Sequence, residues 1–237
     1  MSELTDNVSR EEIEQFDQQS AFWWDLEGPF KTLHQINPVR LEYLQKYTDL
    51  KQKTALDVGC GGGIFSEALA TAGADVTGLD MSEQALQTAR LHLHESNVSV
   101  RYEHSTVEAF AQQQQTFDVV CCLEMLEHVP DPESVIKACL EMTKPGGWLF
   151  LSTINRNPKS MMLAIVAAEH ILRIVPAGTH RYKNFIKPSE LVGAVQRADA
   201  VVEDISGMSY NPFSGKAAIQ PEDVSVNYLL AARKPDS

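Results

Sequence analysis

Short apolar segments alternate with amphipathic ones along most of this chain. Strands are predicted at 55–58, 74–80, 98–102, 117–123 and 148–153, of which 117–123 is the most continuously apolar, and segments with helical periodicity stand between them at 64–70, 83–95 and 131–143. Runs that are apolar throughout indicate strands buried on both faces of a sheet. Because strands and helices alternate at these lengths, the pattern predicts an α/β fold with a doubly wound, parallel sheet.

The first 50 residues differ from this regular pattern because they contain no strand signal. A polar helix is predicted to start at 10–16, and an amphipathic helix follows with Pro38 near its first turn. We interpret 1–50 as a helical cap over the sheet edge, ahead of the main α/β domain at 51–237. Trp23 and Trp24 either line a substrate pocket in this cap or pack its core.

Two further strands are predicted near the C-terminus, at 201–205 and 226–232. A segment rich in turn residues, including Pro212, joins them. Earlier in the chain, 144–147 reads Lys-Pro-Gly-Gly and predicts a turn before the fifth strand. The pattern therefore gives seven strands in all.

Bulk composition excludes several classes of protein. The chain has 237 residues and a net charge of −12, whereas a general nucleic-acid binder needs a basic surface. The four cysteines lack the spacing of metal ligands, and we expect reduced, buried thiols in a cytoplasmic protein. The polar, acidic stretch 1–14 gives no signal-peptide pattern, and no apolar run is long enough to cross a bilayer.

A glycine-rich turn after the first strand carries the strongest chemical signal. Gly59 and Gly61 match the first two glycines of a dinucleotide fingerprint, but Ile64 stands where its third glycine would be. Asp57 precedes the turn, and a carboxylate there repels phosphate and attracts an ammonium group. The pattern D-x-G-x-G-x-G therefore suits a nucleoside that carries a cationic amino acid, and it resembles the first motif of class I S-adenosylmethionine methyltransferases. A plain strand-to-helix turn is the alternative.

The second predicted strand also ends in an acid, Asp80, which follows Asp57 by 23 residues. This separation is typical of a carboxylate that accepts hydrogen bonds from ribose hydroxyls. Ser82 is positioned to cap the helix at 83–95.

One segment after the fifth strand stands out by its charge. Between Arg156 and Lys187 there are six lysines or arginines and one acid, Glu169. Inside this stretch, 161–175 is mostly apolar. An apolar helix flanked by cations suits an anionic membrane surface, and a lid over the active site is the equal alternative for the insertion at 157–187.

Motifs spread over almost the whole chain resemble those of the ubiquinone biosynthesis O-methyltransferase family. The most specific are Trp23-Trp-Asp-Leu-Glu-Gly28, Ile36-Asn-Pro-Val-Arg-Leu41, Asn155-Arg-Asn157 and Phe185-Ile-Lys-Pro188; more widespread ones are Leu56-Asp-Val-Gly-Cys-Gly-Gly-Gly63 and Glu124-Met-Leu-Glu-His-Val-Pro-Asp-Pro132. The resemblance implies a Rossmann-like sheet of seven strands, mostly parallel, whose last strand is antiparallel.

The same resemblance implies S-adenosylmethionine as cofactor and polyprenylated catechol-type rings as substrates, namely 2-polyprenyl-6-hydroxyphenol and 3-demethylubiquinol. Such lipid substrates imply an enzyme of the cytoplasm that associates peripherally with the inner membrane. They also leave room for other ubiquinone-biosynthesis proteins as partners. No nucleic acid is expected.

The resemblance also assigns residues to the cofactor. Arg40 is expected on the methionine carboxylate, Asp57 on the amino group and Asp80 on the ribose. The remaining expected contacts come from Gly59 and Gly61 in the turn, Met81 after the second strand, and Leu123 at the end of the fourth, where other members have methionine. A surface cation on the cap helix is the alternative for Arg40.

Transfer to a phenol requires help with its proton, because the pKa of a phenol lies near 10. His128, just past the fourth strand, is the candidate base, with Glu124 as a second catalytic residue. Glu124, Glu127 and His128 have i, i+3, i+4 spacing, and on one helical face they would form a site for Mg²⁺ or another divalent cation that a catechol chelates. Alternatively, Glu127 and His128 only stabilise the turn into the next helix.

Three other functions compete with this interpretation. A class I methyltransferase acting on a soluble catechol or other small acceptor shares the cofactor site. A nicotinamide-dependent oxidoreductase shares the layered fold, although Ile64 weighs against it. A lipid-binding scaffold without catalysis would not need Asp57, the glycines and Asp80 together.

Overall fold

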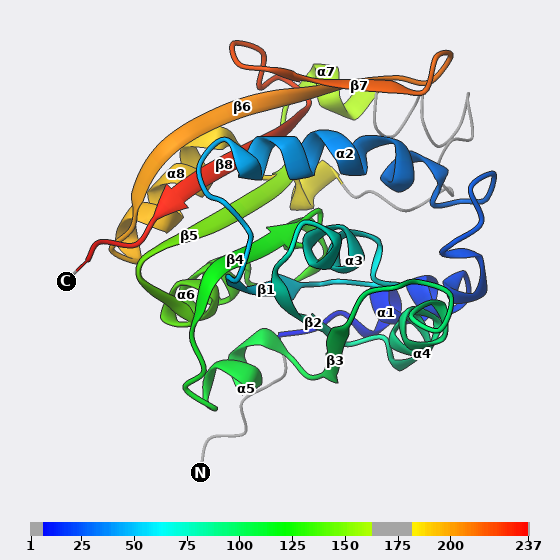
Figure 1. The fold of residues 1–237 in the computed structure, drawn as a ribbon. Helices are drawn as coiled ribbons and strands as arrows, with labels where there is room; N and C mark the ends of the chain where they lie inside the picture. Colours follow the sequence, from blue (N-terminus) through cyan, green and yellow to red (C-terminus); the bar gives the residue numbers. More distant parts are fainter. Residues whose placement is uncertain (1–6, 163–181, 237) are drawn as a thin grey trace.

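An eight-stranded sheet runs through the molecule in the order β3-β2-β1-β4-β5-β8-β6-β7 (Figure 1). The computed structural model describes residues 7–162 and 182–236. The strands are β1 (Thr54–Val58), β2 (Asp75–Asp80), β3 (Val100–His104), β4 (Phe117–Leu123), β5 (Thr143–Ile154), β6 (Val201–Asn211), β7 (Lys216–Gln220) and β8 (Asn227–Arg233). Strands β3, β2, β1, β4 and β5 are parallel, and β8 lies antiparallel between β5 and β6. The Rossmann-like fold and its antiparallel last strand are confirmed.

The sheet has one strand more than the seven predicted. The segment interpreted as turn-rich contains β7, which pairs antiparallel with β6 from Gly207 to Asn211. Short strands at a sheet edge carry little of the apolar pattern that reveals buried strands, because their side chains alternate toward solvent. In β7 the side chains are alternately exposed and half-buried.

The prediction that 144–147 form a turn before the fifth strand is wrong. These residues belong to β5, where the pairing with β4 shifts register between Phe117 and Val119. Gly146 has a φ of 71°, and its N–H donates to the Lys234 carbonyl at 2.9 Å. The glycines therefore form an irregularity within an extended strand.

Helices cover both faces of the sheet (Figure 1). The helical elements are α1 (Arg10–Asp17), η1 (Ser20–Phe22), α2 (Lys31–Gln45), α3 (Ile64–Thr71), α4 (Glu83–His92), α5 (Val107–Ala111), η2 (Leu126–His128), α6 (Pro132–Glu141), α7 (Pro158–Ser160), η4 (Tyr182–Asn184) and α8 (Pro188–Arg197). Helices α2, α3 and α4 pack on one face, and α5, α6 and α8 pack on the other. The Ser82 hydroxyl accepts from the Ala85 N–H at 3.0 Å, which confirms the predicted cap of α4.

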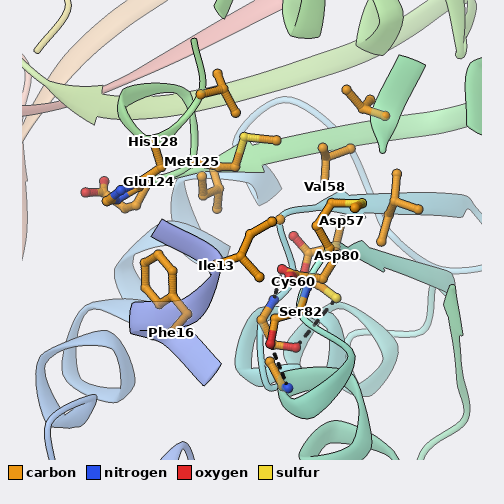
Figure 2. A pocket seen from close by; sticks show the side chains of 18 of the residues that line it. Ile13, Phe16, Asp57, Val58, Cys60, Asp80, Ser82, Glu124, Met125 and His128 are labelled. Carbon is orange, nitrogen blue, oxygen red and sulfur yellow. Dashed lines mark hydrogen bonds between the residues drawn. The ribbon is translucent and has the colours of Figure 1, made fainter. Parts of the chain in front are cut away.

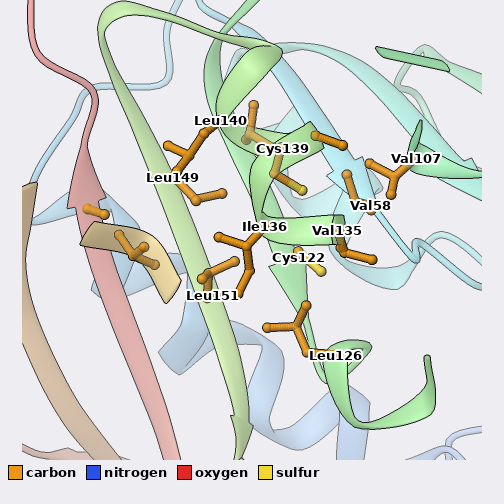
Figure 3. Packing of buried hydrophobic residues seen from close by; sticks show 14 of the residues in the cluster. Val58, Val107, Cys122, Leu126, Val135, Ile136, Cys139, Leu140, Leu149 and Leu151 are labelled. Atoms are coloured by element: carbon orange, nitrogen blue, oxygen red, sulfur yellow. The ribbon is translucent and has the colours of Figure 1, made fainter. Parts of the chain in front are cut away.

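Alternate residues of the central strands serve two cores. In β4, Cys121 faces the α2–α3–α4 side and Cys122 the α5–α6–α8 side. Figure 3 shows the second core, where Leu149 and Leu151 of β5 meet Ile136 of α6. Both sides of these strands are buried, which explains why Val119–Leu123 and Leu149–Leu151 are apolar without alternating polar residues. All four cysteines are free and buried.

Helix α2 begins seven residues before Pro38, so the proline lies inside the helix and not in its first turn. Proline has no N–H to donate to the His34 carbonyl, yet its ring is tolerated within this helix. The helix packs against β7 and α3, and it buries Tyr43 and Leu44 in the core.

Most of the insertion predicted at 157–187 lies outside the described residues, which resume at Tyr182. Within the described residues, no helix is long and apolar enough to cross a membrane.

Candidate active site

A pocket lies where β1, β2 and β4 end, at the carboxyl edge of the parallel strands (Figure 2). Parallel strands bring their ends to one edge, so residues far apart in sequence converge there. Nine predicted site residues line this pocket: Arg40, Asp57, Gly59, Gly61, Asp80, Met81, Leu123, Glu124 and His128. Glu127 is buried and is not part of the lining.

The glycine turn needs glycine for two separate reasons. Gly59 and Gly61 have φ values of 72° and 52°, in the left-handed region that other residues rarely adopt. In addition, a Cβ on Gly61 would stand 2.1 Å from Cζ2 of Trp23, whose indole lies on the turn and stacks on Phe30. Trp23 is thus both a core residue and part of the pocket wall.

Asp80 stabilises the same turn. Its Oδ2 accepts from the Gly61 N–H and its Oδ1 from the Ser82 N–H, both at 2.8 Å. Burial raises the pKa of Asp80, and these backbone donors oppose the shift. Each carboxylate oxygen keeps lone-pair capacity, so the group can still accept hydrogen bonds from a diol in the pocket.

Asp57 is buried at the end of β1, and the Ser66 hydroxyl donates to its Oδ2 at 2.6 Å. Burial raises the pKa of Asp57 to about 6, although the Ser66 hydrogen bond and the Arg40 charge lower it. The carboxylate is therefore ionised at neutral pH and holds a negative charge against the pocket, which suits an ammonium group.

Arg40 of α2 is only 5% exposed. Burial lowers the pKa of its guanidinium, and the charges of Glu124 and Asp57 oppose this. Among the residues that the structure describes, its Nε and Nη2 find no hydrogen-bond partner, and neither does Oδ1 of nearby Asn37. Buried donors without partners are costly, so this guanidinium fits the carboxylate of a bound ligand. In one pocket, Asp57 can accept hydrogen bonds from an ammonium group and Arg40 can donate them to a carboxylate. Together these two side chains suit an amino acid.

Glu124 follows β4 with a φ of 54°. The Ser152 hydroxyl donates to its Oε1 at 2.8 Å, and the Asn227 amide donates to its Oε2 at 3.3 Å. This left-handed residue ends the strand and directs the chain into η2.

The predicted shared helical face of Glu124, Glu127 and His128 is wrong, because Glu124 lies outside η2. Glu127 accepts a hydrogen bond from the Thr153 hydroxyl at 2.8 Å, whereas His128 pairs with a different residue, Glu12. Across the described ranges, no group of three histidine, cysteine, aspartate or glutamate side chains is arranged to hold a metal ion. As they are placed here, the three residues do not fit the predicted cation site.

His128 is held from the N-terminal side of the chain. Its Nδ1 lies 2.9 Å from Glu12 Oε2, and its ring meets Phe16 edge-on, with centroids 5.3 Å apart. Burial lowers the pKa of His128, but the Glu12 hydrogen bond and the charges of Glu127 and Glu124 outweigh it, so the pKa is raised. The side chain lines the pocket beside Glu124 and Met125 (Figure 2).

Several site residues were not predicted from the sequence. Glu12 and Phe16 belong to a helix that looks like a plain polar helix start, and only packing brings them to the pocket. Trp24, by contrast, was a candidate for the pocket wall but lies outside the lining: it donates from Nε1 to the Gly62 carbonyl at 2.8 Å and stacks on His92. The adjacent aromatics were the only sequence signal for this contact.

The fold and this site define an S-adenosylmethionine-dependent methyltransferase. A family described as a methyltransferase domain matches residues 31–205. Solved structures with the same fold include magnesium protoporphyrin IX methyltransferase from Synechocystis with bound SAH, at a TM-score of 0.66 and 18% identity, covering 93% of this chain and 94% of that one. A possible histamine N-methyltransferase from Thermotoga maritima has a TM-score of 0.65 and 17% identity, with 95% and 100% covered.

Full-length relatives identify the particular family. The ubiquinone biosynthesis O-methyltransferase of Nitrosospira multiformis is 52% identical over 96% of this chain and 95% of its own length. That of Saccharophagus degradans is 50% identical over 96% and 97%. The chain therefore belongs to the ubiquinone biosynthesis O-methyltransferase family.

Proposed function

We propose that this protein methylates a phenolic hydroxyl of polyprenylated catechol-type intermediates, including 2-polyprenyl-6-hydroxyphenol and 3-demethylubiquinol. The observation that carries the proposal is the near-complete coverage of relatives named for ubiquinone biosynthesis, at 50–52% identity. The pocket supports it, because amino-acid-binding charges and an apolar wall with Phe16 and Met125 lie side by side.

In this proposal the cofactor spans the carboxyl ends of β1 and β2. Arg40 binds its carboxylate, Asp57 its ammonium group and Asp80 its ribose, while Gly59 and Gly61 allow close approach of the backbone. Met81 and Leu123 complete the walls. When bound, S-adenosylmethionine supplies an electrophilic methyl group. We retain 51–237 as the catalytic domain and 1–50 as its cap.

His128 is the proposed general base. A phenol is a weak nucleophile until its proton is removed, and a histidine at the pocket wall can take that proton. Glu124, beside it, contributes negative charge that favours the protonated imidazole after the transfer. The fixed pocket aligns the phenol oxygen with the methyl group, which lowers the entropic part of the barrier.

A divalent cation is not part of the proposed mechanism, because Glu124, Glu127 and His128 are directed to separate protein partners. Titrating the protein with Mg²⁺, alone and with a catechol present, tests this. Saturable Mg²⁺ binding that Glu127→Gln abolishes would restore the three residues as a cation site.

We also propose that the enzyme works in the cytoplasm, peripherally on the inner membrane, with the basic segment 157–187 as its contact to anionic lipids. A polyprenyl tail partitions into lipid, so the enzyme must meet its substrate there or receive it from another ubiquinone-biosynthesis protein. The exposed Met161 and Met162, at the start of the apolar run, support this contact. Deleting 161–181 is expected to reduce binding to anionic vesicles and leave affinity for S-adenosylhomocysteine intact; unchanged vesicle binding would reject the membrane contact.

The cofactor site is tested by titration calorimetry with S-adenosylhomocysteine. Micromolar binding is expected for the wild type, and Asp80→Ala is expected to abolish it. Asp75→Ala is the matched control, because Asp75 is exposed at the opposite end of the same strand. No binding to the wild type would refute the methyltransferase site.

The acceptor is tested by comparing a prenylated catechol in detergent with a water-soluble catechol. A kcat/KM at least tenfold higher for the prenylated ring supports the proposal. Preference for the soluble ring would instead identify a methyltransferase of small soluble acceptors.

A further inference from the structure

The first described residues form a strap over the pocket, which we define as Asn7–Asp17. At one end, the Asn7 amide donates to Glu108 Oε1 at 2.8 Å and to the Asp131 carbonyl at 2.7 Å, while Asp131 N–H donates back to Asn7 Oδ1 at 2.8 Å. At the other end, the Ser82 hydroxyl donates to Asp17. The strap thus connects segments that follow β2, β3 and β4, among them the start of helix α5.

The middle of the strap, helix α1, faces the pocket. Ile13 and Phe16 of this helix line it, and Figure 2 shows Ile13 extending toward Asp57 and Asp80 while Phe16 lies on the side of Glu124 and His128. Because these side chains line the pocket together with the strand ends, a cofactor bound there would lie between the strap and the sheet edge.

Glu12 is the strap residue whose carboxylate pairs with a ring nitrogen of His128. Its carboxylate and the imidazole are both nearly enclosed, with side chains 9% and 14% exposed. A carboxylate accepts but does not donate, so in the neutral imidazole it keeps the proton on Nδ1 and leaves the lone pair on Nε2. Nε2 is the nitrogen that remains to receive a proton.

We propose that Glu12 is a positioning residue, which fixes the orientation and tautomer of His128 when the strap covers the pocket. This inference rests on the proposed role of His128 as general base. The phenol proton then passes to Nε2, the phenolate oxygen bonds to the methyl carbon, and the carbon–sulfur bond breaks with its electron pair left on sulfur. The strap therefore both lines the pocket and positions the proposed general base, His128.

The competing explanation is that Glu12 only holds α1 in place. Asp17 distinguishes the two explanations, because it holds the same helix in place through its hydrogen bond with Ser82 and makes no bond to His128. Glu14 is a matched control: it is the same residue type, two positions away in α1, and exposed.

The test measures kcat at saturating cofactor and prenylated catechol, together with affinity for S-adenosylhomocysteine. We expect Glu12→Ala to lower kcat roughly 100-fold, within the range of general-base effects, and Glu12→Gln about tenfold, since an amide oxygen still accepts from Nδ1. Affinity for S-adenosylhomocysteine is expected to stay within threefold. Glu14→Gln is expected to change neither quantity. Equal losses of kcat in Glu12→Gln and Asp17→Asn would overturn the proposal.

Nitrogen NMR of the S-adenosylhomocysteine complex gives a readout independent of turnover. The wild type is expected to show His128 protonated on Nδ1, and Glu12→Ala a mixture of tautomers; an unchanged tautomer contradicts the inference. The variant His128→Asn distinguishes the proposed role of His128 as general base from the positioning role of Glu12. If it keeps full kcat, the base assignment fails; if it loses kcat while Glu12→Ala keeps it, only the positioning role fails.

Discussion

Arg40 Nη2 lies 3.4 Å from Glu124 Oε1, an ion pair between a buried cation and a partly buried carboxylate. The distance is long for a hydrogen bond, so the pair balances charge and leaves donors of the guanidinium available. A residue of the cap region and one at the end of β4 thereby share the wall of the pocket.

Replacing Arg40 by lysine keeps the charge but removes the planar pair of donors that matches a carboxylate. We expect S-adenosylhomocysteine to bind roughly 10- to 100-fold more weakly, a loss of about 1.5–3 kcal/mol for hydrogen bonds to a charged group. Titration calorimetry measures this. Arg197→Lys is the control, because Arg197 is exposed on α8; equal affinities in both variants would remove Arg40 from the cofactor site.

Affinity for the cofactor is expected to decrease as pH is lowered, because the carboxyl of Asp57 has a pKa of about 6. Below that pH the carboxyl is neutral and no longer attracts an ammonium group. When pH is lowered from 7.5 to 5, the dissociation constant of S-adenosylhomocysteine should rise roughly tenfold. At one pH unit below its pKa, the Asp57 carboxyl is ionised in only about one molecule in ten. Asp57→Asn should bind weakly at both pH values. An equally steep dependence in that variant would assign the titration to another group.

Gly61→Ala is expected to destabilise the fold, because the new Cβ combines a positive φ with a position 2.1 Å from Trp23. The cost is at least about 1–2 kcal/mol, which lowers Tm by several degrees in a protein of this size. Gly193→Ala, inside α8, should raise Tm, since alanine is favoured in helices by about 0.5–1 kcal/mol. Its Cβ meets only the end of the Arg197 side chain, at 3.1 Å. Similar Tm changes in both variants would contradict this account of the turn.

Glu127 is expected to make the protein less stable as pH rises. Burial raises the pKa of its carboxyl from 4.5 to about 7, so the folded state binds more protons than the unfolded state between these values. The stabilisation is complete below about pH 4.5 and is lost as pH rises through 7. Glu127→Gln should therefore be more stable than the wild type by roughly 1–3 kcal/mol at pH 8, and by less at pH 5. Calorimetry with a chelator present checks this; a difference independent of pH would refute it.

The sequence was sufficient for the layered fold and for placing Asp57 and Asp80 at the edge of the sheet where the pocket lies. Strands buried on both faces are mainly apolar, and this pattern, together with the helical segments between the strands, located β1, β2 and β4. Asp57 and Asp80 interrupt it at the strand ends, so their place at the sheet edge follows directly from the chain. Edge strand β7 lacks that pattern and was missed for the same physical reason.

Spacing was a poorer guide where the backbone departs from a regular helix. Glu124, Glu127 and His128 would share a face only if the helix began at Glu124, but its φ of 54° directs its side chain toward Ser152 and Asn227. Left-handed conformation of a non-glycine residue depends on its surroundings, and no local signal announces it.

By itself, then, the sequence determined the alternation of strands and helices in the parallel part of the sheet, the glycine turn and its acids, and the family, because these depend on local patterns of residue type. Tertiary structure alone decided that Arg40 keeps unpartnered donors at the pocket and that Glu12 bonds to His128 across 116 positions of the chain. Such contacts depend on how α1 and α2 pack over the sheet edge. Packing is set by the whole molecule, so no short stretch of sequence encodes it.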